Sequence, residues 1–155
     1  MRQIIQAETV EQIETARAMF LEYGEWLGFS LCFQGFDHEL AMLPGRYAPP
    51  SGRLLLATNG PDTVGVIALR GLDDETCEMK RLYVRPAGRG HNLGRKLAEH
   101  LLQEARAIGY RRMVLDTLPD KMDAAIALYR RLGFTEIAPY YDNPVEGAIF
   151  LECAL

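Results

Sequence analysis

The sequence predicts an α/β fold with a mixed β-sheet, and three patterns lead to this class. Helical segments alternate with short β-prone runs along the 155 residues. Two apolar runs, Leu54–Thr58 and Val64–Arg70, flank an Asn-Gly-Pro-Asp turn and predict a β-hairpin. A helical crossover then separates a strand at 77–84 from one at 113–115, so these two strands should be parallel.

Length and composition predict one soluble domain spanning residues 1–155. A chain that is 48% hydrophobic and 25% charged can bury a core without disulfide bonds. Three cysteines, Cys32, Cys77 and Cys153, lack the paired spacing of metal or redox sites. A net charge of -4 argues against nucleic acid and acidic membranes as partners, and no apolar run is long enough to span a bilayer. We therefore expect a cytoplasmic protein with reduced thiols and no bound metal.

The first half of the chain begins with a short strand around Ile4 and Ile5. Thr9 and Gln12 form a capping-box pattern that predicts the start of a helix. The apolar positions of this helix follow at helical spacing: Ile13, Ala16, Phe20, Tyr23 and Leu27. The aromatic segment at 28–52 is rich in glycine and proline, which is typical of either a binding lid or a short helix with a loop over the core.

The second half alternates helices and short strands. A helix is predicted from Leu93 to Ile108, with Gly109 in the position of a C-terminal cap, and another from Asp123 to Leu132, with Gly133 in that position. Two late strands at 134–137 and 148–151 follow, separated by a turn-rich loop at 139–144. Together with the hairpin, these elements complete the predicted mixed sheet.

Positive charge is concentrated between Lys80 and Lys96. This window holds six of the 17 basic residues and no acidic residue, although the chain as a whole is acidic. Glycines at 88, 90 and 94 allow backbone amides to approach phosphate oxygens, and the helix that follows supplies an N-terminus. Neither the dinucleotide-binding fingerprint nor the phosphate-binding loop with its Gly-Lys-Ser/Thr ending is present. The window therefore predicts a site for a phosphorylated ligand of another kind.

Three strings in this order resemble the GCN5-related N-acetyltransferase (GNAT) family. They are Leu82-Tyr83-Val84-Arg85-Pro86, then Arg89-Gly90-His91-Asn92-Leu93-Gly94-Arg95, then Leu128-Tyr129-Arg130-Arg131-Leu132-Gly133-Phe134. The resemblance covers residues 64–134. It implies that the strand at 82–84 splays away from the next parallel strand, so that the sheet is splayed at its centre. Acetyl-CoA, the co-substrate, would lie in that gap with its pantetheine arm paired to the strand.

The resemblance also implies which residues bind the cofactor. The expected contacts come from Leu82, Tyr83, Val84, Arg89, Gly90, His91, Asn92, Leu93, Gly94 and Arg95. Asn92 stands where the family usually has glycine, and asparagine tolerates a left-handed backbone better than most residues. Met122 stands where many relatives carry an asparagine that contacts the cofactor.

Acetyl transfer to an amine needs a group that removes a proton and a group that stabilises the leaving thiolate. Because a free alkyl amine has a pKa near ~10, a base must act close to the thioester. Glu78 is the candidate base, directly or through a water, and the alternative is an ion pair with Lys80 or Arg81. Tyr129 matches the family's tyrosine that protonates the sulfur, and the alternative is a packing role. A backbone amide near Leu82 would polarise the carbonyl, with no covalent enzyme intermediate.

The acceptor is expected to bind against the 26–47 segment and the 140–144 loop, with contacts from Phe33, Arg46, Tyr47 and Tyr140. Aromatic residues together with Arg46 and Arg70 suggest a small primary amine that also bears a carboxylate or a ring. Two alternatives stay open: acetylation of a protein N-terminus or lysine, and a non-catalytic CoA-binding regulatory module. The sequence is compatible with a monomer and with a homodimer.

Overall fold

One mixed sheet of seven strands forms the centre of the molecule. The computed structural model describes residues 2–28 and 35–155, with the backbone alone at 2 and 120–122, so the predicted contact Phe33 lies outside the described residues. The strand order is β1-β2-β3-β4-β5-β7-β6. The strands are β1 (Arg2–Gln6), β2 (Arg53–Asn59), β3 (Asp62–Gly71), β4 (Thr76–Val84), β5 (Arg112–Thr117), β6 (Thr135–Ile137) and β7 (Ile149–Ala154).

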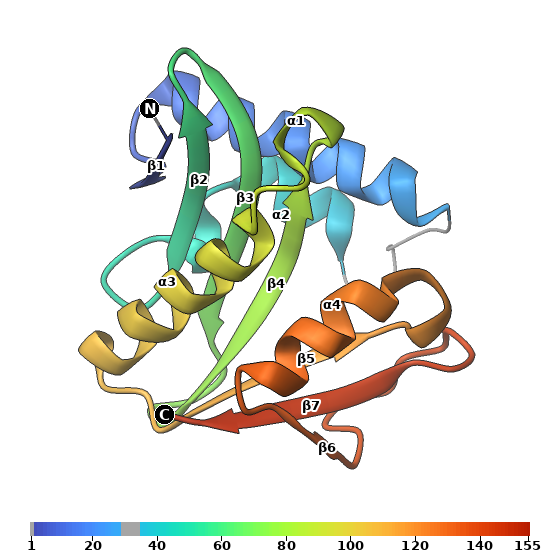
Figure 1. The fold of residues 1–155 in the computed structure, drawn as a ribbon. Coiled ribbons are helices and arrows are strands. Elements are labelled where there is room, and N and C mark those ends of the chain that lie inside the picture. Colours follow the sequence, from blue (N-terminus) through green and yellow to red (C-terminus); the bar gives the residue numbers. More distant parts are fainter. Residues whose placement is uncertain (1, 29–34) are drawn as a thin grey trace.

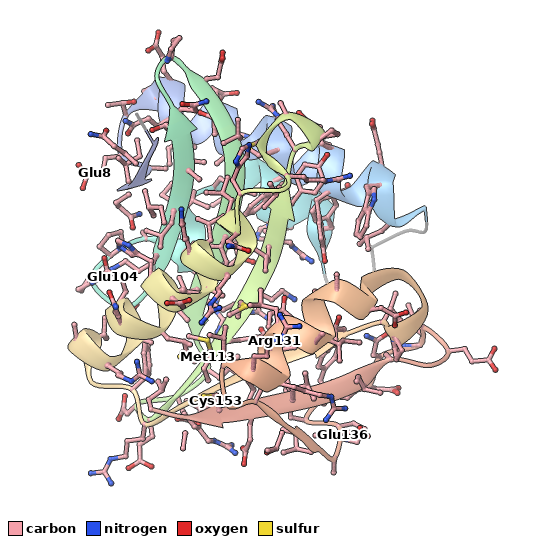
Figure 2. All side chains as sticks on the ribbon, in the orientation of Figure 1. Glu8, Glu104, Met113, Arg131, Glu136 and Cys153 are labelled. Atoms are coloured by element: carbon pink, nitrogen blue, oxygen red, sulfur yellow. The ribbon has the colours of Figure 1, made fainter. Side chains whose placement is uncertain are left out.

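Helices cover both faces of this sheet. Helices α1 (Val10–Leu27) and α2 (Phe36–Met42) pack on one face, and α3 (Leu93–Ile108) and α4 (Pro119–Arg131) lie on the other (Figure 1). Each face has its own buried cluster, because alternate residues of a strand point to opposite sides. Met113 of β5 and its partner Cys153 of β7 belong to the cluster beneath α3 and α4 (Figure 2).

The helix ends follow the predicted capping residues. Thr9 Oγ1 accepts from the Gln12 amide at 3.1 Å, and Gln12 Oε1 accepts from the Thr9 amide at 3.0 Å, which completes the capping box. Gly109 and Gly133 have φ angles of 113° and 105°, as left-handed caps require. Helix α4 begins at Pro119, earlier than the expected Asp123, because proline is well suited to a first helical turn. No helix in the described part of the chain is long and apolar enough to cross a membrane.

The structure resolves the alternatives for the aromatic segment only in part. Its described portion forms the short helix α2 and a single 3-10 turn at Gly45–Tyr47 that leads into β2. Strands β5 and β7 are longer than the expected 113–115 and 148–151, since they pair with each other along six residues. The residues at the ends of such paired strands show little apolar alternation of their own. The lengths of β5 and β7 are therefore underestimated from the sequence.

The sheet splits at its centre, as the resemblance implied. Strands β4 and β5 are parallel, and their pairing runs only from Thr76 opposite Arg112 to Glu78 opposite Val114. Strand β5 continues beside β7 as far as Thr117, while β4 continues beside β3 as far as Val84. The two strands therefore diverge beyond Glu78, and Figure 1 shows β4 and β5 running apart from a common start.

Candidate active site

A groove of about 340 Å³ lies where β4 and β5 diverge. It receives residues from both sheet faces, since its walls include α1 on one side and α4 on the other. The lining residues used below are Tyr23, Trp26, Lys80, Arg81, Leu82, Tyr83, Val84, Arg89, Gly94, Asp116, Tyr129 and Asn143. Because β4 has no β5 partner after Glu78 among the described pairs, its backbone edge is open to a ligand along this groove.

A β-bulge shapes the β4 wall of the groove. Val66 pairs with Tyr83 and Ala68 with Lys80, so Ile67 of β3 faces two residues of β4. One of these two is Arg81, whose φ angle of 63° is unusual for a residue other than glycine. The extra residue bends the strand and shifts its side-chain alternation, which adds to the separation of β4 from β5.

Arg81 is fixed in this conformation by its partners on α2. Its guanidinium donates to both carboxylate oxygens of Glu39, at 2.9 and 3.0 Å, and lies 5.0 Å from the ring centre of Phe36. Both side chains of the pair are largely buried, so the contact is a strong charge-assisted one. The bulge is therefore held by tertiary contacts that compensate for the strained backbone.

The predicted phosphate loop opens α3. Gly90 has a φ angle of 86°, and Asn92 is left-handed at 56° in the position where the family has glycine. The first intrahelical bond runs from the Lys96 amide to the Asn92 carbonyl at 3.0 Å, so the preceding helix amides are available to a ligand. The Asn92 side chain makes no capping hydrogen bond to these amides. The loop thus presents backbone donors at a helix N-terminus, a favourable arrangement for phosphate.

Asn92 provides a test of this loop conformation. Asn92→Gly should keep the free energy of unfolding close to that of the parent chain, because glycine adopts a positive φ angle without strain. Asn92→Val should lower it by about 1–2 kcal/mol, since a β-branched residue is poorly accommodated there. Urea denaturation of both variants measures the difference. Equal stabilities for the two variants would show that the left-handed conformation is not required.

The structure separates the predicted cofactor residues into two groups. Leu82, Tyr83, Val84, Arg89 and Gly94 line the groove, and a shallower depression beside it is lined by Val84, Gly88, Arg89, Gly90, Asn92, Leu93 and Gly94. His91 is exposed and lines neither. Arg95 is exposed and pairs with Glu99 at 2.6 Å. The side chain of Leu93 is buried in the core, so its amide is the group that a ligand could reach.

Acidic residues outside the basic window neutralise part of its charge. Arg81 pairs with Glu39, Arg95 with Glu99, and Arg85 with Glu22 at 2.6 Å. Arg85 also donates to the Thr63 carbonyl at 2.8 Å and thus joins the loop to β3 and α1. The window is consequently less positive in the folded protein than the sequence alone indicates. Arg89 lies beside the phosphate loop and donates to the Val84 carbonyl at 3.0 Å.

Tyr129 lies in the groove wall formed by α4. It is only 6% exposed, and its ring packs against Phe134 at a centroid distance of 5.6 Å. Burial raises the pKa of its phenol well above the usual range, and Tyr23 and Asp116 act in the same direction. The hydroxyl is therefore neutral at physiological pH and is able to donate a hydrogen bond. The Tyr129 ring is also part of the core cluster, so the residue has the packing role that was the alternative interpretation.

Glu78 lies behind the groove and is 1% exposed. Its Oε1 accepts from Arg70 Nε at 2.7 Å, and its Oε2 accepts from the Tyr140 hydroxyl at 2.6 Å. Burial favours the neutral form of this carboxyl, but the charges of Lys80 and Arg70 and the two hydrogen bonds outweigh it, so the pKa is lowered. The carboxylate is thus ionised and is bonded to both Arg70 and Tyr140.

Asp116 is a groove residue that the sequence reasoning missed. It lies in β5 beyond the part that pairs with β4, and it accepts hydrogen bonds from the Tyr141 hydroxyl and from Asn143 Nδ2, the latter at 2.8 Å. Its charge raises the pKa values of Tyr23, Tyr129 and Tyr140. The signal in the sequence was an acidic residue at the carboxyl end of an apolar strand, where α/β proteins commonly bind ligands.

Lys80 is a second such residue, considered from the sequence only as an ion-pair partner of Glu78. It is 5% exposed and lines the groove on the face covered by α1 and α2. Burial lowers the pKa of its ammonium group to about 8, and the nearby charge of Arg81 contributes in the same direction. Glu78 and Asp116 oppose this shift. A buried, poorly solvated cation therefore faces the groove.

The structure places the predicted acceptor contacts apart from one another. Tyr47 is buried against Phe20 with a centroid distance of 6.0 Å and does not line the groove. Arg46 donates to the Gly71 carbonyl at 2.6 Å and lines a separate depression. Tyr140 stands on the loop before β7, next to the groove residue Asn143 and bonded to Glu78.

The described residues contain no group of three or more His, Cys, Asp or Glu side chains that could hold a metal ion. His38, which stands between two acidic residues in the sequence, lies in the first turns of α2. Among the ionisable residues that line the groove, Arg81 pairs with Glu39, and Asp116 accepts hydrogen bonds from Tyr141 and Asn143.

Comparisons with known proteins agree with this architecture. The family model described as the Acetyltransferase (GNAT) family matches residues 13–134. An uncharacterised N-acetyltransferase of Schizosaccharomyces pombe is 38% identical over 143 residues, covering 91% of this chain and 87% of the relative.

Solved acetyltransferase structures have the same fold. One from Streptococcus agalactiae is 24% identical with a TM-score of 0.80, covering 99% of this chain and 98% of the other. A putative acetyltransferase from Salmonella typhimurium, solved with its cofactor acetyl-CoA, is 22% identical with a TM-score of 0.72, covering 99% of this chain and 94% of the other. The match of the family model over most of the chain, together with the splayed sheet, shows that this protein is an acyltransferase of the GNAT family.

Proposed function

We propose that this enzyme transfers an acetyl group from acetyl-CoA to the primary amine of a small molecule. The observation that carries the proposal is the groove between β4 and β5, whose lining includes both Gly94 in the first turn of α3 and ionisable side chains. Both reactants would meet in this groove, so that the amine attacks the acetyl carbon directly. Burial raises the pKa of the Cys77 thiol to about 12, which disfavours the thiolate that a covalent mechanism would need.

The chain has the groups that acetyl-CoA requires. The open edge of β4 offers backbone partners for an extended amide-containing arm, and the phosphate loop offers amides and Arg89. Gly88 keeps this loop close to β3, since a Cβ there would lie 2.9 Å from Val64 Cβ. When bound, acetyl-CoA supplies the activated acetyl thioester. A backbone amide near Leu82, at the bulge, is proposed to polarise the thioester oxygen.

Tyr129 is proposed to stabilise the leaving thiolate. Its raised pKa makes it a weaker acid than an ordinary thiol, so it acts mainly as a hydrogen-bond donor to the sulfur. Such a bond strengthens as negative charge develops on the leaving group, which stabilises the transition state more than the ground state. When the amine nitrogen bonds to the acetyl carbon and the C–S bond breaks, the amine proton would go to the base described below, and the thiolate bonded to Tyr129 would take its proton from solvent on release.

For the base we propose Glu78 acting through Tyr140. The Tyr140 hydroxyl can accept the amine proton while its own proton moves to Glu78 Oε2, 2.6 Å away. The phenol stays neutral in this transfer, which suits a residue whose pKa is raised by burial and by Glu78. Arg70 stabilises the ionised form of Glu78 before the transfer.

Two neighbouring tyrosines allow a matched test of this relay. Tyr140→Phe removes the hydroxyl bonded to Glu78, and we expect kcat to fall by about 10-fold or more. Tyr141→Phe removes the equivalent bond to Asp116 and should lower kcat much less. Steady-state kinetics with saturating acetyl-CoA compares the two variants. A larger effect at Tyr141 than at Tyr140 would shift the base assignment away from Glu78.

One observation supports a small acceptor, and another supports nitrogen as the acceptor atom. Asn143 and Val145 bring the loop before β7 into the groove lining, which limits the room on the acceptor side. The S. pombe relative is named an N-acetyltransferase, in agreement with nitrogen as the acceptor atom. The cytoplasmic location stays a prediction, and so does the expectation that the protein is a monomer or a homodimer.

A thiol-release assay with acetyl-CoA tests the proposed function. The acceptor panel should contain simple amines, amino acids, and peptides with a free N-terminus or an internal lysine. Turnover with the small molecules at higher kcat/KM than with peptides is the expected result. Preference for peptides would favour protein acetylation, and tight CoA binding without any turnover would favour a regulatory module.

A further inference from the structure

We propose that Asp116 binds the ammonium group of the acceptor, and that an aromatic cluster on α1 and β4 packs against an apolar or aromatic body of the same molecule. The cluster consists of Tyr23, Trp26 and Tyr83, which line the groove together with Asp116. The inference rests on the proposed function and specifies its substrate class, a hydrophobic primary amine. Of the two features that the sequence suggested for the acceptor, a carboxylate or a ring, it selects the ring.

Asp116 and the aromatic cluster lie on the same side of the sheet. Met113 and Leu115 of β5 belong to the core cluster beneath α3 and α4, so Asp116 points to the opposite face, which α1 and α2 cover. Tyr83 belongs to the core cluster of that face, and Tyr23 packs against it. The phosphate loop opens α3 on the other face. An acceptor can therefore approach from the α1 side while CoA occupies the α3 side.

The hydrogen-bond partners of Asp116 are neutral, which distinguishes it from the other carboxylates near the groove. Glu39 and Glu78 are each paired with an arginine. Asp116 instead accepts from the Tyr141 hydroxyl and the Asn143 amide, and both bonds go to Oδ2. These two donors hold the carboxylate in place without cancelling its charge. Since a carboxylate can accept about four hydrogen bonds, it can take a further one from a ligand ammonium group.

The cationic side chains of this face lie on the β4 wall of the groove, opposite Asp116 on β5. They are Arg81, which is paired with Glu39, and the buried Lys80. A ligand ammonium group is repelled by the β4 wall and attracted by the β5 wall. The two walls therefore orient the ligand, with its charged end at Asp116.

The aromatic cluster determines which kind of amine the groove favours. Its ring centroids are 6.2 Å apart for Tyr23–Tyr83, 6.4 Å for Tyr23–Trp26 and 6.5 Å for Trp26–Tyr83. Such rings offer apolar surface to a ligand, and their faces attract a nearby cation. The charge of Asp116 acts on Tyr23, whose pKa it helps to raise, so the carboxylate and the rings lie close together. An ammonium group attached to an apolar or aromatic body matches both.

The proposed role of Asp116 is recognition, which is compatible with Glu78 as the base. An alkyl amine with a pKa near ~10 is mostly an ammonium ion in neutral solution, and Asp116 binds this form. The ammonium group loses one proton to solvent and becomes the free amine. The proton released as the nitrogen bonds to the acetyl carbon then goes to Tyr140 and Glu78. The charge of Asp116 also contributes to the raised pKa of Tyr140, so the bound amine lies near this relay.

Calorimetric titration in the presence of CoA, which has no acetyl group to transfer, tests the ammonium site without turnover. The wild type should bind 2-phenylethylamine about 10-fold or more tightly than its neutral analogue 2-phenylethanol. Asp116→Asn should bind the two about equally, because an asparagine oxygen can still accept from Tyr141 and Asn143 but carries no charge. Glu136→Gln removes a negative charge at an exposed residue outside the groove and should keep the preference of the wild type.

Rates of thiol release with acetyl-CoA test the aromatic cluster. The kcat/KM values for 2-phenylethylamine and hexylamine should exceed that for ethylamine by about 10-fold or more, since the larger amines bury apolar surface against the rings. Trp26→Ala should lower this advantage by about 3-fold or more. Leu21→Ala changes an exposed apolar residue of the same helix outside the groove and should preserve the advantage. Asp116→Asn should act mainly by raising KM for the amine.

The two levels of proposal can fail separately. If the wild type binds the alcohol as tightly as the amine, or uses ethylamine as well as 2-phenylethylamine, the inference is overturned, while turnover of small amines leaves the proposed function intact. This comparison does not depend on the folding of any variant, which titration with CoA checks. If no small amine is acetylated, the proposed function is rejected and the titration alone decides. A preference for the amine that Asp116→Asn loses then supports the ammonium site, and absence of binding or of preference overturns it.

Discussion

Tyr129→Phe is expected to lower kcat by about one to three orders of magnitude, which corresponds to ~1.4–4 kcal/mol of lost transition-state stabilisation. The substitution removes only the hydroxyl, because the ring is already packed against Phe134 and phenylalanine can make the same contact. KM for acetyl-CoA should change little, since the hydroxyl interacts most strongly with charge that develops on the sulfur during the reaction. Rates of thiol release at saturating concentrations of both substrates measure the effect.

A matched control is available in Tyr110. It is also a buried tyrosine, but its hydroxyl donates to the Ser51 carbonyl at 2.7 Å, and the residue does not line the groove. Tyr110→Phe should therefore reduce stability without a specific loss of kcat. If single-turnover measurements show that chemistry limits the rate and Tyr129→Phe still has the kcat of the parent enzyme, Tyr129 has no role in the transfer.

The pH dependence gives the same assignment an independent check. Burial raises the pKa of Tyr129, so the phenol keeps its proton throughout the neutral and mildly alkaline range. Activity should therefore not decline between about pH 7 and 9 through ionisation of this tyrosine, whose usual pKa is already near ~10. The pH profile of Tyr129→Phe should keep the shape of the parent profile at a lower level.

The phosphate loop and the helix caps could be predicted from the sequence because their determinants are local. Glycine or asparagine at a left-handed position, followed by periodic apolar residues, specifies the start of α3 within a few residues, and Asn92 indeed has a positive φ angle. The parallel pairing of β4 and β5 also followed from a local feature, the helical crossover between them. The splay itself came only from the family resemblance.

The acceptor side could not be predicted in the same way, since its contacts join residues that are distant in the chain. Glu78 meets Tyr140 across 62 positions, and Arg81 meets Glu39 across 42. The alternation of residues along β4 does not reveal that the bulge containing Arg81 redirects the side chains that follow it. Asp116 lies in the groove because β5 diverges from β4, and this divergence is a property of the sheet as a whole.

Gly94→Asp is expected to separate folding from cofactor binding. Gly94 lies in the first turn of α3 and lines both the groove and the adjoining depression, and a Cβ added there would meet only Val84, at 4.0 Å. A carboxylate in the first turn of a helix interacts favourably with the helix dipole, by about 0.3–1 kcal/mol, and replacement of a helical glycine adds a similar amount. Thermal unfolding should therefore show equal or higher stability.

The same carboxylate would occupy the place where the phosphates of CoA are proposed to bind, and the two negative charges would repel each other. We expect the affinity for CoA, measured by calorimetry at low salt, to fall by about 100-fold or more, which is ~2.7 kcal/mol. Gly94→Ala adds the Cβ without the charge and should lose much less affinity. If the Gly94→Asp variant is folded and binds CoA like the parent chain, the phosphates must bind elsewhere, because a carboxylate in the first turn of α3 would repel them.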